Sequence, residues 1–148
     1  MQIRKMLSSD YNDVYNLWLN TPGTGLNTTD DSKEGIEKYL RRNPNTCFVA
    51  EKSGEIVGVI LSGHDGRRGL IYHLAVKISE REQGIGNALI DHALEALNNE
   101  GIAKVYIIVL KGNAEGNAFW DKRGFVIPDE SLYRAKEINS LVHFYPQL

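Results

Sequence analysis

Cysteine is almost absent from this chain of 148 residues. The one cysteine, Cys47, cannot form an internal disulfide and cannot supply a metal site alone, so a disulfide scaffold and a cysteine-rich metal site are excluded. A single cysteine without a disulfide partner is typical of proteins in a reducing compartment. The sequence also lacks an apolar signal core near its start and any apolar run long enough to span a bilayer. We therefore expect a soluble, cytoplasmic protein.

The chain also has no large excess of positive or of negative charge. The chain has 17 Lys and Arg residues against 19 Asp and Glu, which leaves a net charge of −2. Bulk charge therefore gives no attraction to nucleic acid or to an anionic membrane, and we expect neither as a partner. With 42% hydrophobic and 24% charged residues the composition is that of a globular protein, and the length predicts one domain over residues 1–148.

Hydrophobic periodicity predicts a succession of strands and helices along the chain. Ser8 or Ser9 is expected to cap the first helix, and the nearly continuous apolar run 104–110 predicts a strand covered on both faces. Residues from Leu132 onward have no clear assignment. The order β-α-α-β-β-β-α-β-α-β indicates an α/β (α+β) fold with a mixed, mostly antiparallel sheet. The expected strands are 2–7, 47–51, 56–61, 70–76, 104–110 and 125–127, and the expected helices are 10–20, 32–42, 84–100 and 114–122.

The most informative segment joins the strand that ends at Val76 to the longest expected helix. Its loop contains Arg81, and two glycines, Gly84 and Gly86, open the helix. The first turn of a helix leaves backbone N–H groups without internal partners, and the helix dipole favours negative charge there. Glycines let an anion approach the backbone closely, so this corner predicts a phosphate or pyrophosphate site.

Two common phosphate-binding loops do not fit this corner. The P-loop pattern Gly-x4-Gly-Lys-Ser/Thr does not occur in the chain. The dinucleotide fingerprint needs a third glycine where Leu89 stands, and it needs repeated βαβ units that the element order lacks.

The remaining pattern, Arg81-x-x-Gly84-x-Gly86 between a strand and a helix, resembles the acetyl-coenzyme A motif of the GNAT superfamily. A second block, from Asn113 to Phe125, is similar to that family's Asn-x-x-Ala-x-x-Phe-Tyr-x-Lys-x-Gly-Phe pattern. The two blocks occur in the expected order and separation, and the similarity in element order covers roughly residues 2–127. It implies a GNAT fold with helices on both faces of a sheet that splits into a V. In size and layout the chain resembles bacterial ribosomal-protein-type N-terminal acetyltransferases.

The resemblance implies acetyl-CoA as co-substrate, no metal, and a coenzyme site in three parts. The backbone of one strand would pair with the pantetheine arm, the loop and helix start would surround the pyrophosphate, and the second block would contact the coenzyme's arm. These residues are, in that order, Leu74, Ala75 and Val76; Arg81, Glu82, Gln83, Gly84, Ile85, Gly86 and Asn87; and Asn113, Phe119 and Trp120. Asn113 also has the alternative role of a helix cap.

The position of the family's usual proton donor is changed in this chain. Many relatives have a tyrosine where Trp120 stands, and an indole N–H donates a hydrogen bond but does not usefully release a proton. Two alternatives stay open: another tyrosine (Tyr72, Tyr106 or Tyr133) serves instead, or the thiolate leaves unassisted.

For the catalytic base, the sequence offers His73 on the strand that borders the expected cleft. Imidazole ordinarily titrates near neutral pH, which suits removal of a proton from an amine. Because side chains alternate along a strand, one of Tyr72 and His73 should face the cleft and the other the opposite face. Glu51, His64 and Asp65 are further candidates, each with the alternative of a solvated surface position.

The sequence therefore predicts direct transfer of acetyl from acetyl-CoA to a primary amine in a ternary complex, with a backbone N–H near Val76 holding the oxyanion. The acceptor is a small molecule or a peptide or protein amine. A non-catalytic acyl-CoA sensor of the same fold is the alternative, favoured by Trp120, and an interaction domain without cofactor is a third. A homodimer is compatible with this size class, because small enzymes commonly form two-fold dimers.

Overall fold

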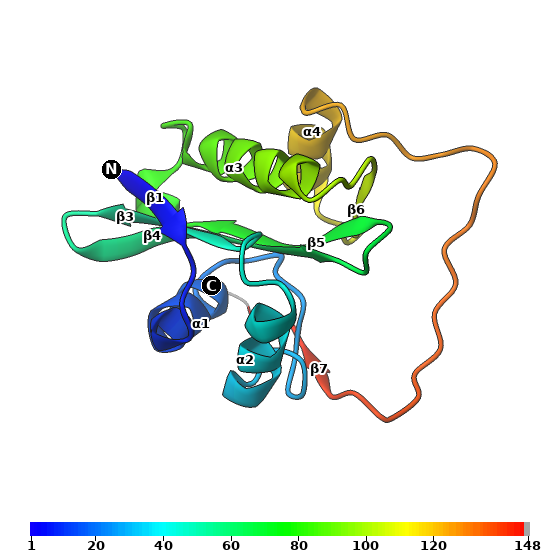
Figure 1. Ribbon diagram of the computed structural model, residues 1–148, viewed down its shortest axis with the longest axis horizontal. Helices are drawn as coiled ribbons and strands as arrows, with labels where there is room; N and C mark the ends of the chain where they lie inside the picture. Colours follow the sequence, from blue (N-terminus) through cyan, green and yellow to red (C-terminus); the bar gives the residue numbers. More distant parts are fainter. Residues whose placement is uncertain (147–148) are drawn as a thin grey trace.

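A five-stranded sheet lies at the centre of the computed structural model, which describes residues 1–146 (Figure 1). The strand order is β1-β3-β4-β5-β6, and every pairing is antiparallel except that of β5 with β6. Helices α3 and α4 cover one face and α1 and α2 the other. This confirms the predicted α/β class, the mixed sheet and the helices on both faces. The predicted domain, 1–148, includes two residues outside the described range.

The strands are β1 (Gln2–Lys5), β3 (Phe48–Lys52), β4 (Glu55–His64), β5 (Gly69–Val76) and β6 (Val105–Ile107), with a separate pair, β2 (Leu26–Asn27) and β7 (His143–Phe144). The helices are α1 (Tyr11–Leu19), α2 (Lys33–Arg42), α3 (Ile85–Asn99) and α4 (Ala114–Lys122), with single 3-10 turns at Ser8–Asp10 and Ile78–Glu80.

The core consists of two apolar layers, one on each side of the sheet. Alternation along β4 directs Val59 and Leu61 towards α1 and Ile60 towards α3. Trp18 of α1 and Leu89 of α3 are fully buried opposite them. The central strands are therefore fixed from both faces, which gives the neighbouring β5 a rigid support.

Each helix starts at the predicted residue or one residue later, but the predicted cap of the first helix is wrong. Ser32, the predicted first residue of the second helix, caps α2, with its Oγ accepting the Gly35 N–H at 3.0 Å. The prediction that Ser8 or Ser9 caps the first helix is wrong, because both lie in a 3-10 turn and α1 begins after Asp10. In residues 1–146, no helix combines the length and apolar character needed to cross a membrane.

The expected strand 104–110 is much shorter than its apolar run. Only Val105–Ile107 pairs, β6 lies at the sheet edge, and Ile108 is 53% exposed. The prediction of a strand covered on both faces is wrong, because the chain leaves β5 after Ile107. The expected strand 125–127 is also wrong: Val126 and Ile127 are 83% and 86% exposed and lie in irregular chain.

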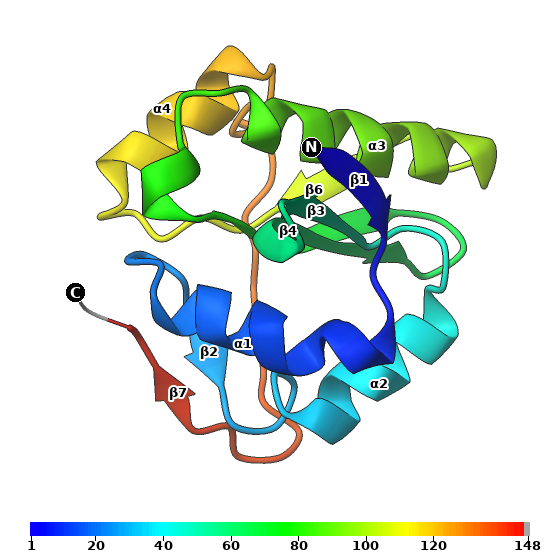
Figure 2. The same cartoon turned by 90° about the vertical axis from the view of Figure 1, so that its left-hand side faces the viewer.

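Residues 126–142 form a long irregular segment, called the arm below, that joins α4 to β7 and loops out beside the sheet edge (Figure 1). At its end, β7 pairs antiparallel with β2, with Leu26 opposite Phe144 and Asn27 opposite His143. This small sheet lies beside α1, on the α1/α2 side of the main sheet (Figure 2). Phe144 packs against the core on that side. Neither β2 nor β7 was predicted, since each contributes only two residues.

Candidate active site

The sheet opens between β5 and β6. Their pairing covers three positions and ends with Ile71 opposite Ile107, although β5 continues alongside β4 to Val76. The predicted V-shaped split is therefore present. A cavity of about 970 Å³ lies there, a volume typical of ligand sites. The part of its wall that concerns the chemistry consists of Tyr72, His73 and Leu74 of β5, Ile107 to Leu110, Asn113 and Trp120, Asp31 and Tyr39, and His143 and Tyr145.

A β-bulge places two neighbouring side chains in this cavity. His73 is opposite Leu61 of β4 but Ile71 is opposite Ser62, so Tyr72 is an extra residue in β5. The bulge breaks the alternation of side chains. Tyr72 contacts Tyr39 of α2, and His73 contacts an aromatic ring of α1 on the same side of the sheet. The prediction that only one of Tyr72 and His73 faces the cleft is therefore wrong.

His73 is held by a buried carboxylate. Its Nε2 lies 2.8 Å from Oδ1 of Asp31, and the two side chains are only 10% and 6% exposed. The Trp18 ring packs against the imidazole, with centroids 4.7 Å apart. In residues 1–146 the second ring nitrogen, Nδ1, has no hydrogen-bond partner, yet it is not fully buried. The histidine therefore has one nitrogen available for proton exchange.

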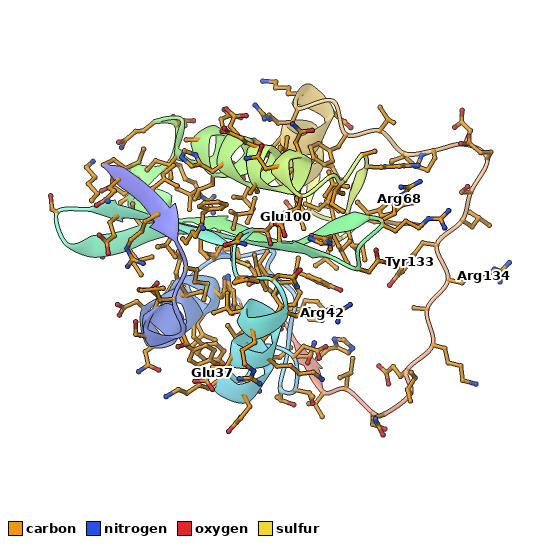
Figure 3. The ribbon with its side chains drawn as sticks, in the orientation of Figure 1. Glu37, Arg42, Arg68, Glu100, Tyr133 and Arg134 are labelled. Carbon is orange, nitrogen blue, oxygen red and sulfur yellow. The ribbon has the colours of Figure 1, made fainter. Side chains whose placement is uncertain are left out.

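Tyr72 is the tyrosine of the three candidates that lines the cavity. It is half-exposed, and its pKa is raised from 10 by partial burial and by the negative charge of Asp30 and the proximity of Tyr133. Its phenol therefore keeps its proton to higher pH than a free tyrosine and is able to donate it near neutral pH. Tyr106 lies on the exposed edge of β6, and Tyr133 points from the arm back towards the sheet (Figure 3). In the described part of the chain, neither of these two lines the cavity.

The start of α3 has the free backbone groups that an anion needs. Its first internal hydrogen bond runs from the Ala88 N–H to the Gly84 carbonyl at 3.0 Å, so the amides of the three preceding residues have no partner within the helix. Gly84 adopts a left-handed φ of 81°, and a Cβ there would meet open space. A Cβ on Gly86 would lie 3.6 Å from Phe119, an ordinary contact. The residues present therefore fit a pyrophosphate group.

The loop before α3 is tied to the end of β5. The Arg81 Nε donates to the Val76 carbonyl at 3.3 Å, and Gln83 accepts from Lys52 at 3.4 Å. Glu82 adopts a left-handed φ of 63°. The Arg81 contact holds the guanidinium at the end of β5, in the loop that leads into α3, and its positive charge adds to the effect of the free amides.

The second block supports the site from α4. Asn113 caps this helix, with its Oδ1 accepting the Gly116 N–H at 2.9 Å, and it also lines the cavity, so capping and coenzyme contact are compatible. Trp120 is 7% exposed and packs between Phe119 and Phe125, with centroids 5.3 and 4.8 Å away. Trp120 is therefore part of the core and of the cavity wall, whereas Phe119 packs against the same core and, in the described part of the chain, does not line the cavity.

The other sequence candidates lie elsewhere. Glu51 accepts from Arg4 at 2.7 Å across β1 and β3, and His64 pairs with Glu100 at 3.2 Å. Asp65 accepts two backbone N–H groups of its own turn at 2.8 Å. As far as the structure describes the chain, none of these three lines the cavity, and no group of three or more His, Cys, Asp or Glu side chains could hold a metal ion.

Sequence reasoning missed Asp31, the residue that contacts His73. It lies 42 positions away in a polar loop, next to the Ser32 cap of α2. A burial prediction for this loop would have been needed to find it, because Asp31 looks like any other residue of a polar turn.

Comparison with known proteins gives a consistent result. The model of the "Acetyltransferase (GNAT) family" matches residues 11–125. The chain is 33% identical over 138 residues to acetyltransferase SG1711 of Sodalis glossinidius, covering 93% of this chain and 96% of that protein. It is 38% identical over 117 residues to acetyltransferase plu1384 of Photorhabdus laumondii, covering 76% and 78%.

Solved structures show the same fold at lower identity. The PaiA N-acetyltransferase of Thermoplasma acidophilum, in complex with coenzyme A, is similar with a TM-score of 0.75 at 18% identity, covering 88% of this chain and 92% of that one. The ribosomal-protein-S18-alanine N-acetyltransferase of Escherichia coli is similar with a TM-score of 0.69 at 18% identity, covering 83% and 76%.

Proposed function

Because this chain belongs to the GNAT acetyltransferase family and is an acetyl-CoA-dependent acyltransferase, we propose that it acetylates a primary amine of a small molecule, peptide or protein. We propose direct transfer, with amine and coenzyme bound together in one domain formed by residues 1–148. The observation that carries this proposal is the cavity at the strand split, where His73 and Tyr72 lie together.

Three parts of the chain have a geometry that fits the coenzyme. The unpaired amides at the start of α3 and the Arg81 guanidinium would hold the pyrophosphate. The open edge of β5 from Leu74 to Val76 would hold the pantetheine arm by strand addition. Asn113, at the cavity wall, would contact that arm. When bound, the coenzyme supplies the acetyl group as a thioester.

His73 is the proposed proton acceptor. An amine is nucleophilic only as the free base, so a neighbouring group must take its proton near neutral pH. The His73 Nδ1 has no competing partner in the part of the chain described, and the ring lines the cavity. We expect His73→Gln to lower kcat by about 10²–10⁴-fold, the range for loss of a general base, without weakening coenzyme binding.

Tyr72 is the proposed proton donor in place of the family's usual tyrosine. Its phenol lies beside His73 in the cavity, and partial burial raises its pKa. The two groups then have separate roles. The imidazole takes a proton from the amine, and the phenol supplies one to the departing sulfur.

A non-catalytic acyl-CoA sensor is the second candidate, because Trp120 replaces the tyrosine that serves as donor in many relatives. One experiment separates the two. Thiol release is followed with a panel of small amines, amino-acid amides and peptides, and coenzyme A binding is measured by calorimetry. Release above background that His73→Gln abolishes supports the enzyme. Tight binding without release for any amine supports the sensor.

A further inference from the structure

We infer that Asp31 is a positioning residue for His73, holding the imidazole in the tautomer and orientation that an amine-facing base requires. The inference rests on the proposed function of His73. It adds a second residue to the chemistry, from a loop that contributes nothing to the coenzyme site.

The carboxylate of Asp31 is fixed through both of its oxygens. Oδ1 lies 2.8 Å from the His73 Nε2, and Oδ2 accepts the Asn27 N–H at 2.8 Å. The backbone carbonyl of Asp31 accepts the Tyr11 hydroxyl of α1 at 2.7 Å. A carboxylate this deeply buried is stable only with such partners, and here one of them is the candidate base.

The contact determines which nitrogen carries the proton. The Asp31 carboxylate can only accept a hydrogen bond, so Nε2 of the neutral imidazole must carry the hydrogen. Nδ1 then keeps its lone pair. Trp18 packs against the ring and restricts its rotation. His73 is therefore prepared to accept a proton at Nδ1, and the carboxylate stabilises the imidazolium that forms.

Other charged and titratable groups around the cavity make no hydrogen bond or ion pair with the imidazole in residues 1–146. Tyr72 precedes His73 in β5, and Tyr39 of α2 contacts the Tyr72 ring. Further groups from the α1–α2 loop, α2 and β7 share the wall: Asp30, Glu34, Lys38, Arg42 and His143. In residues 1–146, Asp31 is the one charged side chain within hydrogen-bonding distance of the imidazole, so it is the group that fixes the ring.

The loop also connects His73 to the C-terminal strand. Asn27, whose amide holds Asp31, lies in β2 and is paired with His143 of β7. The orientation of the base thus depends on chain regions far apart in sequence, on the side of the molecule seen in Figure 2.

The test compares Asp31→Asn with Asp13→Asn. Asp13 is the control, because it is an exposed carboxylate of α1 that neither lines the cavity nor contacts His73 in the part of the chain that the structure describes. We expect Asp31→Asn to lower kcat by about 100-fold and to leave the KM for acetyl-CoA unchanged, because the imidazole loses the partner that orients it. Asp13→Asn should change neither value.

A second measurement needs no turnover. Long-range ¹H–¹⁵N NMR spectra of the ligand-free protein, with His73 assigned through His73→Gln, report the tautomer directly. In the wild type the neutral ring should carry its hydrogen on Nε2, and Asp31→Asn should weaken that preference. A protonated Nδ1 in the wild-type protein would overturn the inference even if the variant did not fold.

The two proposals fail in different ways. If His73→Gln keeps full activity, the proposed base is wrong, whereas the NMR spectra still report whether Asp31 controls the ring. If His73→Gln is inactive but Asp31→Asn matches the wild type in kcat and in the His73 tautomer, the base stands and the positioning role is refuted.

Discussion

Tyr72 reaches the cavity only because β5 contains one extra residue. A side chain in its place on a regular strand would point to the opposite face from His73. The bulge therefore brings the proposed proton donor and the proposed proton acceptor into one cavity from adjacent sequence positions. In the proposed mechanism Tyr72 compensates for Trp120, whose indole cannot take over the family's usual donor role.

Replacing Tyr72 by phenylalanine tests that compensation. Because partial burial raises the pKa of Tyr72, the phenol keeps its proton to higher pH than a free tyrosine, so a decline of wild-type kcat through loss of this proton should begin at higher pH than for a free phenol. Tyr72→Phe should lower kcat by about tenfold to a hundredfold. Tyr106→Phe, a tyrosine outside the cavity, is the control for steady-state assays across pH 7–10. Equal rates for Tyr72→Phe and the wild type would remove the donor role.

The Trp120→Tyr variant tests whether the indole contributes to core packing alone or also to catalysis. The indole is almost fully buried between Phe119 and Phe125, so a smaller ring leaves unfilled volume in the core. We expect the free energy of unfolding to fall by about 1–3 kcal/mol, measured by urea titration, while kcat is kept or rises. A severe loss of kcat in a folded variant would mean that the indole itself has a specific catalytic role.

The start of α3 is the element whose geometry supports coenzyme binding most directly. Gly84→Glu and Gly86→Glu both add a long negative side chain at the free amides, and we expect each to abolish coenzyme A binding in calorimetry through steric block and charge repulsion. Gly86→Ala should bind normally, because its Cβ would make only an ordinary contact with Phe119.

Gly66→Glu controls for backbone strain in this comparison. Gly66 has a φ of 91° and open space around it, like Gly84, but it lies in the turn between β4 and β5 at the other end of the strands. Coenzyme affinity equal to the wild type in a folded Gly84→Glu protein would contradict the assignment of the pyrophosphate site.

Elements with strong periodicity were predictable from sequence, and those set by tertiary pairing were not. The helix 114–122 matches α4 at both ends, and 84–100 differs from α3 by one residue at each end, since capping and periodicity are local properties. The run 104–110 was misleading because apolar content does not show where a strand leaves its neighbour. The bulge at Tyr72 likewise depends on the register with β4, which local sequence does not reveal.

The candidate site divides in the same way. The strand-to-helix corner at Gly84, with its unpaired amides, was predictable, since a glycine-rich junction is a contiguous motif. The proposed acceptor side depends on the contact of His73 with Asp31 and on a β7 strand from the far end of the chain. Such contacts across the chain follow from the fold and leave no local pattern.

At the scale of the whole molecule, apolar surface is concentrated at one edge. β6 and the residues after it expose Tyr106, Ile108 and Leu110, and the adjoining arm exposes a further apolar series. In Figure 3, Tyr133 points back from the arm towards the sheet while Arg134 points outwards. An unpaired edge strand with apolar side chains is a template for association with another chain.

We therefore expect the protein to self-associate with increasing concentration, as the size class also suggests, and sedimentation velocity should show a shift from monomer towards dimer. Ile108→Lys should move that equilibrium towards the monomer, because a charge on the edge opposes strand addition. Leu7→Lys is the matched control: Leu7 is similarly exposed but lies between β1 and α1, away from this edge. A wild-type chain that stays monomeric at every concentration, or an Ile108→Lys variant that associates as well as Leu7→Lys, would show that the edge and arm do not mediate contact between copies.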